Sequence, residues 1–213
     1  MDRLYDRLIG QLDTLIPFLA LVHREAFDLI GERYGDWLPE WQQGSLPETY
    51  AIYQTQVAHS AFLLGYSYYE AFLSDLARQI YTHSPTMLPQ EKTLTFSDVI
   101  QRPEREQLLA YMIDKEILSV FYQSIEKVIE CFQKKFSLCW PEHTVESAVE
   151  ASLLRNCIIH NNARVDTRLS ERGRWALGSE IKLTAAQVHD FGIIARKVCG
   201  ELAMQADSNF LSR

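Results

Sequence analysis

The feature that most constrains the fold of this chain is the spacing of its apolar residues, which follows the period of an α-helix almost throughout. Leucines recur three or four positions apart from Leu4 to Leu19, which predicts a first helix over residues 2–33 that Pro17 kinks or divides. The same spacing predicts further helices over residues 50–82, 104–136, 143–160 and 185–206. No run of alternating strands is found, so the sequence predicts an all-α fold.

Residues between these helices indicate where the helices begin and end. Glycine and proline recur over residues 31–47, as they do in a linker. Asn161 and Asn162 favour a helix end, because asparagine tolerates the left-handed backbone conformation that is common there. Thr184 is a typical cap at the start of the last helix. The polar, arginine-rich segment 163–182 is predicted to be a loop, with a short hairpin inside it as an alternative.

A chain of 213 residues is long enough to bury a core without disulfides, and we expect a single domain. The helices predict an up-and-down bundle of four to five main helices over residues 50–206. Residues 1–45 would add an N-terminal helix and its linker to that bundle.

Composition narrows the class of protein further. With 47% hydrophobic and 23% charged residues, the chain resembles ordinary soluble globular proteins. The N-terminus mixes charges into an apolar stripe, unlike a signal peptide, and no apolar run approaches the roughly 20 residues of a membrane span. We expect a cytoplasmic protein with no membrane partner. The four cysteines form no CxxC pair and lack zinc spacing, so no metal and no cofactor is expected.

Charge is distributed unevenly along the chain. The net charge of −7 argues against broad, sequence-independent binding of nucleic acid. Residues 155–182 are the exception, because they hold six basic and three acidic side chains. That segment therefore carries +3 while the rest of the chain carries −10. Four of its arginines are candidates for contacts with a nucleic-acid backbone, namely Arg164, Arg168, Arg172 and Arg174.

A candidate catalytic motif opens this basic segment at the end of a predicted helix. Arg155 can hold a phosphate, Asn156 can orient it, and His160 can move a proton. The same spacing recurs at Arg78 and His83, at the end of another predicted helix. Context favours the first pair, because asparagines and a basic loop follow His160, whereas a serine and a proline follow His83.

Two segments of the chain resemble the HEPN superfamily, helical proteins many of which cut RNA. Residues 154–166, with the sequence LRNCIIHNNARVD, resemble the final core helix of that superfamily and its Arg-polar-x(3–5)-His motif. Residues 68–75, with the sequence YYEAFLSD, resemble an earlier core helix. The two segments cover a small part of the chain, and the helical pattern of residues 50–206 is compatible with the rest.

The resemblance implies an endoribonuclease that acts as a homodimer in a prokaryotic defence or toxin setting, on transfer or messenger RNA. An antitoxin is then a possible partner. The mechanism that fits needs no metal: a ribose 2′-hydroxyl attacks the adjacent phosphate, leaving a 2′,3′-cyclic phosphate and a 5′-hydroxyl. His160 would serve as acid or base, Arg155 would stabilise the charge that develops on the phosphate, and Asn156 would orient either group.

Helix geometry adds a condition to this interpretation. At about 100° per residue, Asn156 and His160 lie about 40° apart on one face of a helix, but Arg155 and His160 lie about 140° apart. On a straight helix the arginine and the histidine would not face one phosphate. Either the helix unwinds near His160, or two chains pair and share a composite cleft.

Each candidate residue also has a plainer interpretation. Arg155 could pair with Glu146 or Glu150 while His160 only caps a helix. Glu70 could position the arginine from a neighbouring helix, or it could be a solvated or fold-stabilising carboxylate. The four arginines after the motif could belong to a solvated loop. The alternative function is a catalytically silent helical module for RNA binding or protein assembly.

Overall fold

The computed structural model describes residues 3–14 and 46–211. Over these ranges the protein is all-α, as the apolar spacing predicted, and the sole extended pairing is an isolated antiparallel bridge between Arg164 and Glu180. The elements are an N-terminal helix over residues 3–14, α3 (Leu46–His83), η2 (Pro85–Met87), α4 (Phe96–Ile100), α5 (Arg105–Phe121), α6 (Ile125–Phe136), α7 (Val145–His160), α8 (Thr167–Ser170), α9 (Ala185–Ala206) and η3 (Asp207–Leu211).

Several predicted boundaries agree with the structure. Helix α9 spans residues 185–206, and Thr184 caps it in a capping box with Gln187. Helix α7 ends at His160, and Asn162 adopts the expected left-handed conformation with φ 51°. The predicted helix over residues 2–33 is helical from residue 3 to residue 14, while Pro17 and residues 31–45 of the predicted linker lie outside the described residues. Pro47, which was assigned to the linker, lies in the first turn of α3.

The prediction of one continuous helix over residues 104–136 is wrong. Helix α5 ends at Phe121, and α6 begins at Ile125. Ser124 interrupts the helix because it has an extended backbone, with φ −68° and ψ 156°, at the N-cap position that serine favours. On either side of the break, α5 packs against α3 and α6 packs against α7.

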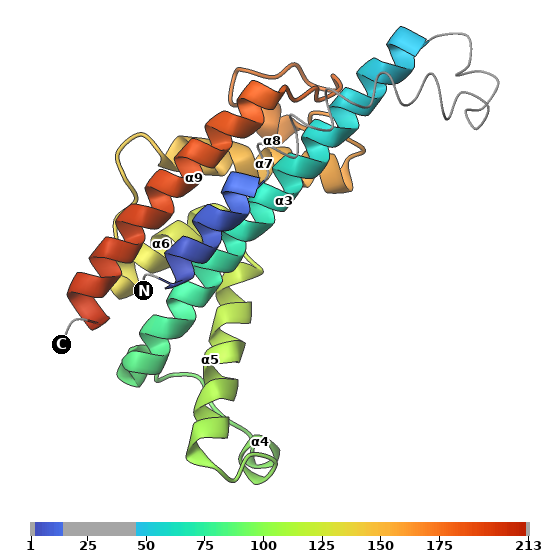
Figure 1. Ribbon diagram of the computed structural model, residues 1–213. Helices are drawn as coiled ribbons and strands as arrows, with labels where there is room; N and C mark the ends of the chain where they lie inside the picture. The colour runs from blue at the N-terminus through green and yellow to red at the C-terminus, as the bar shows by residue number, and fades with distance from the viewer. Residues whose placement is uncertain (1–2, 15–45, 212–213) are drawn as a thin grey trace.

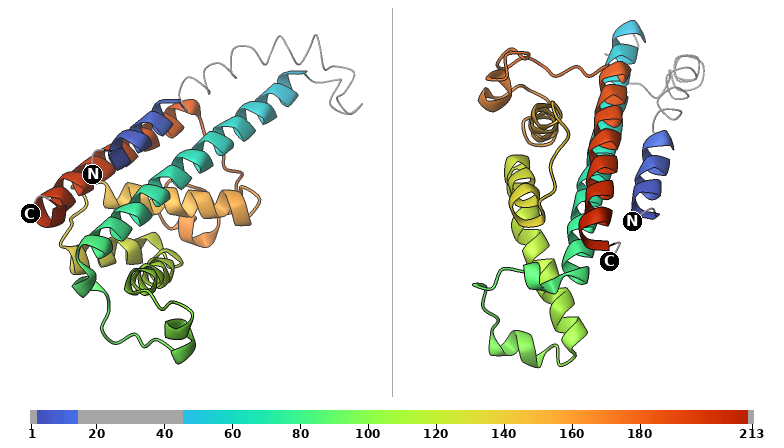
Figure 2. Two further views of the ribbon diagram at one scale, coloured as in Figure 1. Left: turned by 60° about the horizontal axis from the view of Figure 1, so that its bottom comes forward. Right: turned by 90° about the vertical axis from the view of Figure 1, so that its left-hand side faces the viewer.

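Helix α3 lies at the centre of the fold and contacts α5, α7 and α9 (Figure 1). In Figure 2 the helices form three layers: the N-terminal helix on one side, α3 with α9 in the middle, and α5, α6 and α7 on the other side. Arg7 pairs with Asp75 of α3, and Asp13 pairs with Arg196 of α9, which fastens the N-terminal helix to the middle layer.

Aromatic side chains fill the interface between the layers. The rings of Phe62 and Tyr66 on α3 lie 5.2 Å and 5.9 Å from the ring of Phe191 on α9. Trp140, between α6 and α7, donates a hydrogen bond of 3.2 Å to the hydroxyl of Tyr69. These rings are almost fully buried, so they fix how α7 sits against α3.

The arginine-rich loop is more ordered than predicted. Asp166 caps the short helix α8 by accepting a hydrogen bond from the backbone of Leu169. The hairpin alternative is present only as the single bridge already described. Buried His59 of α3 shares a hydrogen bond of 3.0 Å with the carbonyl of Ile181, which anchors the end of the loop. Burial lowers the pKa of His59, although that backbone bond opposes the shift.

Glu116 is a buried carboxylate that connects three segments. It accepts hydrogen bonds of 2.6 Å from Lys92, before α4, and from Lys135 on α6. Burial raises the pKa of Glu116, but the two lysines lower it more, and the net shift is downward. The stabilisation from Glu116 is therefore present above its ordinary pKa of 4.5 and is lost as pH falls through the lowered value.

We predict that Glu116→Gln lowers the free energy of unfolding by about 1.5 to 3 kcal/mol at neutral pH, the value of hydrogen bonds to charged groups. The difference from wild type should narrow as pH falls below 4.5. Denaturant unfolding across pH measures both effects. Glu130→Gln is the matched control, because Glu130 also accepts from two lysines but lies at the surface, where ion pairs contribute little. Equal losses of unfolding free energy in Glu116→Gln and Glu130→Gln would contradict the conclusion that the buried position of Glu116 is what makes it stabilising.

Candidate active site

A cavity of ≈ 680 Å³ opens between α3, the α5–α6 turn, α7 and α8. Its wall contains the whole predicted motif, together with one charged residue from each of three other helices. The polar lining includes Glu70 and Ser74 of α3, Gln123 and Ser124 of the α5–α6 turn, Glu126 of α6, Ser152, Arg155, Asn156 and His160 of α7, and Arg168 of α8. The cavity is therefore assembled from segments that are distant in the sequence.

Arg155 and His160 both line this cavity within one chain. Helix α7 stays helical through His160 and ends immediately after it, where the backbone amides of Asn161 and Ala163 both donate to the carbonyl of Cys157. The helix therefore does not unwind before the histidine. A long arginine side chain and a wide cavity bring the two groups to a shared space despite their angular separation on the helix.

Contacts around Arg155 define its surroundings. Its Nη1 donates a hydrogen bond of 2.9 Å to Oδ1 of Asn156, which orients both side chains. Burial raises the pKa of Glu70, and the positive charge of Arg155 partly opposes that shift, so the two groups lie within electrostatic reach. Burial also raises the pKa of Tyr66, at the cavity wall, to about 12, while a hydrogen bond with Ser152 opposes that shift.

The alternative in which Arg155 pairs with Glu146 or Glu150 does not agree with the structure. Glu150 instead accepts hydrogen bonds of 2.9 Å from Trp175 and 3.1 Å from Arg174. Within the described part of the chain no ion pair joins Arg155 to Glu146 or Glu150. Arg155 therefore remains directed at the cavity, beside Asn156 and opposite Glu70.

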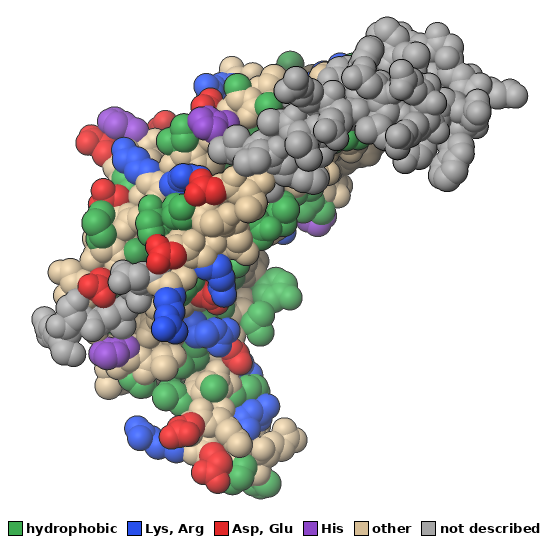
Figure 3. Space-filling view, viewed as in Figure 1, with side chains coloured by type: hydrophobic (Ala, Val, Ile, Leu, Met, Phe, Trp, Pro, Cys, Tyr) green, Lys and Arg blue, Asp and Glu red, His purple; other side chains and the backbone are tan. Residues whose placement is uncertain are grey.

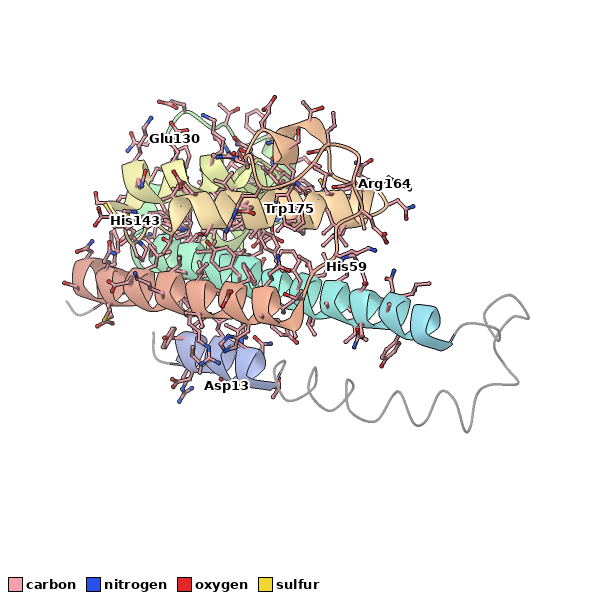
Figure 4. All side chains as sticks on the ribbon, turned by 90° about the horizontal axis from the view of Figure 1, so that it is seen from above. Asp13, His59, Glu130, His143, Arg164 and Trp175 are labelled. Carbon is pink, nitrogen blue, oxygen red and sulfur yellow. The ribbon has the colours of Figure 1, made fainter. Side chains whose placement is uncertain are left out.

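The four loop arginines have different surroundings. Arg168 lines the cavity, and Arg172 lies 3.9 Å from Glu126 at the rim. Arg164 donates to the carbonyl of Gly178, and Arg174 pairs with Glu150. Figure 4 shows Arg164 near the end of α7 and Trp175 lying over the middle of that helix. The four arginines predicted as one RNA-binding group thus divide into two near the cavity and two outside it.

The competing pair occupies a different region. Arg78 is paired with Asp114 of α5, and His83 is exposed at the end of α3. Neither side chain lines the cavity. The structure therefore separates two motifs that have identical spacing in the sequence.

Sequence reasoning missed the contribution of the α5–α6 turn. Gln123 and Ser124 line the cavity, and Tyr122 stands at its edge with 85% of its surface exposed. The signal was available as a serine N-cap followed by an acidic residue in the first turn, Glu126. The predicted continuous helix over residues 104–136 left no turn at this position.

Charges of both signs meet at the cavity, where Glu70 and Glu126 lie with Arg155 and Arg168. Burial raises the pKa of Glu126, but hydrogen bonds from its own backbone amide and from Ser124, together with Arg168 and Arg172, lower it further than burial raises it. On the face of the molecule drawn in Figure 3, acidic and basic side chains are likewise interspersed.

Comparisons with family models, with curated proteins and with solved structures gave no match for this chain. Within residues 3–14 and 46–211, no group of three or more His, Cys, Asp or Glu side chains is placed to hold a metal ion. No helix in those ranges is long and apolar enough to cross a membrane.

We predict that Glu70→Gln raises the thermal stability of the protein at neutral pH. A carboxyl whose folded pKa is raised costs stability once it ionises, and the cost grows as pH rises from its ordinary value of 4.5 through the raised one. Melting temperatures of wild type and variant should therefore converge below pH 4.5 and separate above it. A variant that is less stable at neutral pH would mean that the attraction between Glu70 and Arg155 outweighs burial.

Proposed function

We propose that this protein is an endoribonuclease of the HEPN type. The observation that carries the proposal is that Arg155, Asn156 and His160 line one cavity, beside Arg168 and Glu70. This cavity gathers the groups that phosphodiester cleavage requires: a cation to hold the phosphate, an amide to orient it and an imidazole to transfer a proton. The resemblance of residues 154–166 and 68–75 to HEPN core helices supports the same class.

The proposed reaction begins with an RNA phosphate held by Arg155, with Asn156 fixing the arginine through their hydrogen bond. His160 accepts the proton of the 2′-hydroxyl while water protonates the leaving 5′-oxygen, or His160 protonates the leaving oxygen while water accepts the proton of the 2′-hydroxyl. The attack forms a bond from the 2′-oxygen to phosphorus and breaks the bond to the 5′-oxygen. No metal is required, because Arg155 and Arg168 offset the charge that develops on the phosphate. A defence or toxin setting, transfer or messenger RNA as substrate and an antitoxin partner belong to the same proposal.

The test is incubation of purified protein with total RNA in excess EDTA, with Arg155→Ala/His160→Ala beside it. Wild type should cleave and the double variant should not, since acid–base catalysis alone is typically worth about 10² to 10⁴ in rate. His83→Ala is the matched control and should retain activity. Equal losses from His83→Ala and His160→Ala, with both proteins folded, would overturn the assignment of the site.

Retained RNA affinity without any cleavage by wild type would select the alternative, a catalytically silent module. The observation that favours this alternative is the environment of Arg155, which already has Asn156 as a partner and Glu70 as a nearby charge. In a nuclease Arg155 would hold the scissile phosphate, whereas in a silent module it would keep its contacts with Asn156 and Glu70.

The resemblance implies a homodimer, and we propose that each chain of such a dimer holds a complete site. Mixing Arg155→Ala with His160→Ala protein tests this arrangement, because a site shared between chains would regain one intact copy in the mixed dimer. We predict that mixing restores no cleavage. Recovery of a substantial fraction of wild-type activity would instead establish a composite cleft.

Tyr122 is predicted to stack on an RNA base at the cavity edge, because its ring is exposed there. Tyr122→Ala should weaken binding of single-stranded RNA by about 1 to 3 kcal/mol, the usual value of one base–aromatic stack. Tyr122→Trp should preserve the affinity. Phe96→Ala is the control, since Phe96 is equally exposed but lies on α4, away from the cavity. Fluorescence anisotropy measures these affinities, and equal effects at both positions would contradict the prediction.

A further inference from the structure

A second hollow, of ≈ 350 Å³, lies between α5, α6 and the segment before α4. Lysines dominate its wall. Four of them line it, Lys92, Lys127, Lys134 and Lys135, against two carboxylates, Glu116 and Glu130. We call this hollow the lysine groove. Its charged side chains sum to +2 in a chain whose net charge is −7, so it is a local site of attraction for anions.

The ammonium groups of the lysine groove are held in place. Glu116 has a side chain that is only 4% exposed, and it binds Lys92 and Lys135 at 2.6 Å each. Lys92 also donates to the hydroxyl of Ser119 at 3.0 Å. A buried carboxylate that fixes two lysines reduces the side-chain entropy they would lose on meeting a ligand. The groove is therefore preorganised on this side.

Glu130 holds the other two lysines in the same way, at 2.7 Å from Lys127 and 2.6 Å from Lys134. An ammonium group has three hydrogen-bond donors, and these contacts use one donor of each lysine. Further donors of Lys127 and Lys134 face solvent, because their side chains are 60% and 74% exposed. The groove can therefore offer hydrogen bonds to an anion without breaking its own ion pairs.

The lysine groove adjoins the candidate active site at the α5–α6 turn. Gln123, in the α5–α6 turn, lines both hollows. A flexible strand whose phosphate is held near Arg155 can pass over that turn and follow the groove along α6. Spaced cations matched to a chain of phosphates are the basis of single-strand binding.

We propose that the lysine groove binds the phosphate backbone of the single-stranded RNA whose scissile phosphate occupies the cavity. This inference rests on the proposed function. The groove would hold nucleotides that flank the cleaved bond and so would favour long substrates over short ones. Its ligand is recognised by charge and spacing, without reading of bases.

The test compares Lys127→Ala/Lys134→Ala with a control of equal charge change, Arg3→Ala/Lys197→Ala. All four side chains are exposed, and the control pair lines neither hollow. Lys92 and Lys135 are left intact, because their loss would strand the buried carboxylate of Glu116. Circular dichroism and thermal melting confirm that both variants are folded.

Binding is measured by anisotropy from about 50 to 200 mM salt, on single strands about twenty and about four nucleotides long. Each strand has 2′-deoxy sugars to prevent cleavage. On the long strand the groove variant should lose about 1.4 from the log–log salt slope, because each phosphate contact contributes about 0.7. The affinity of the groove variant for the short strand should match that of wild type. The control variant should keep the wild-type salt slope on the long strand and on the short strand.

A groove variant with the wild-type salt slope on the long strand would overturn the inference. Lysine acetylation with and without RNA gives an independent readout, in which the four groove lysines should be protected and Lys197 should not. Cleavage of an all-ribose short strand tests the cavity separately. Protection of the groove lysines without cleavage would support the RNA-binding groove and contradict the proposed nuclease activity. Cleavage without protection would support the nuclease activity and contradict the RNA-binding groove.

Discussion

The burial of α3 is the constraint on which the rest of the structure depends. This helix contacts α5, α7 and α9, and its aromatic side chains are almost fully buried. Each large apolar side chain removed from water contributes about 1.5 to 3 kcal/mol, so the aromatic face of α3 dominates the core. Glu70 belongs to the same helix, and the packing that buries Tyr66 and Tyr69 also directs Glu70 toward Arg155.

The break between α5 and α6 shapes both candidate sites. A continuous helix would have carried residues 125–136 away from α7. The turn instead brings Ser124 and Glu126 to the cavity and places Gln123 between the cavity and the lysine groove. The same turn exposes Tyr122. One interruption of three residues thus forms the edge of both candidate sites.

The sequence was informative wherever local chemistry decides the outcome. Thr184 and Asn162 marked helix ends correctly, because capping and left-handed conformations depend on the residue itself. The break at Ser124 was missed, because a serine N-cap within an apolar helical period gives a weaker signal than proline. The spacing of Arg155 and His160 could not show that they share a cavity, since that depends on α3, α6 and α8. The lysine groove could not be predicted from the sequence either, because Glu116 contacts Lys92 and Lys135 only in the folded chain.

We propose that a single chain uses Arg155, Asn156 and His160 to cleave RNA through the 2′-hydroxyl. The most direct measurement is end-group analysis of the products formed in EDTA from an RNA with one mapped cleavage position, and from the same RNA with a single 2′-deoxy sugar there. We predict a 2′,3′-cyclic phosphate and a 5′-hydroxyl from the first RNA, and no cleavage at that position in the second. A 5′-phosphate product, or unchanged cleavage of the 2′-deoxy RNA, would contradict it.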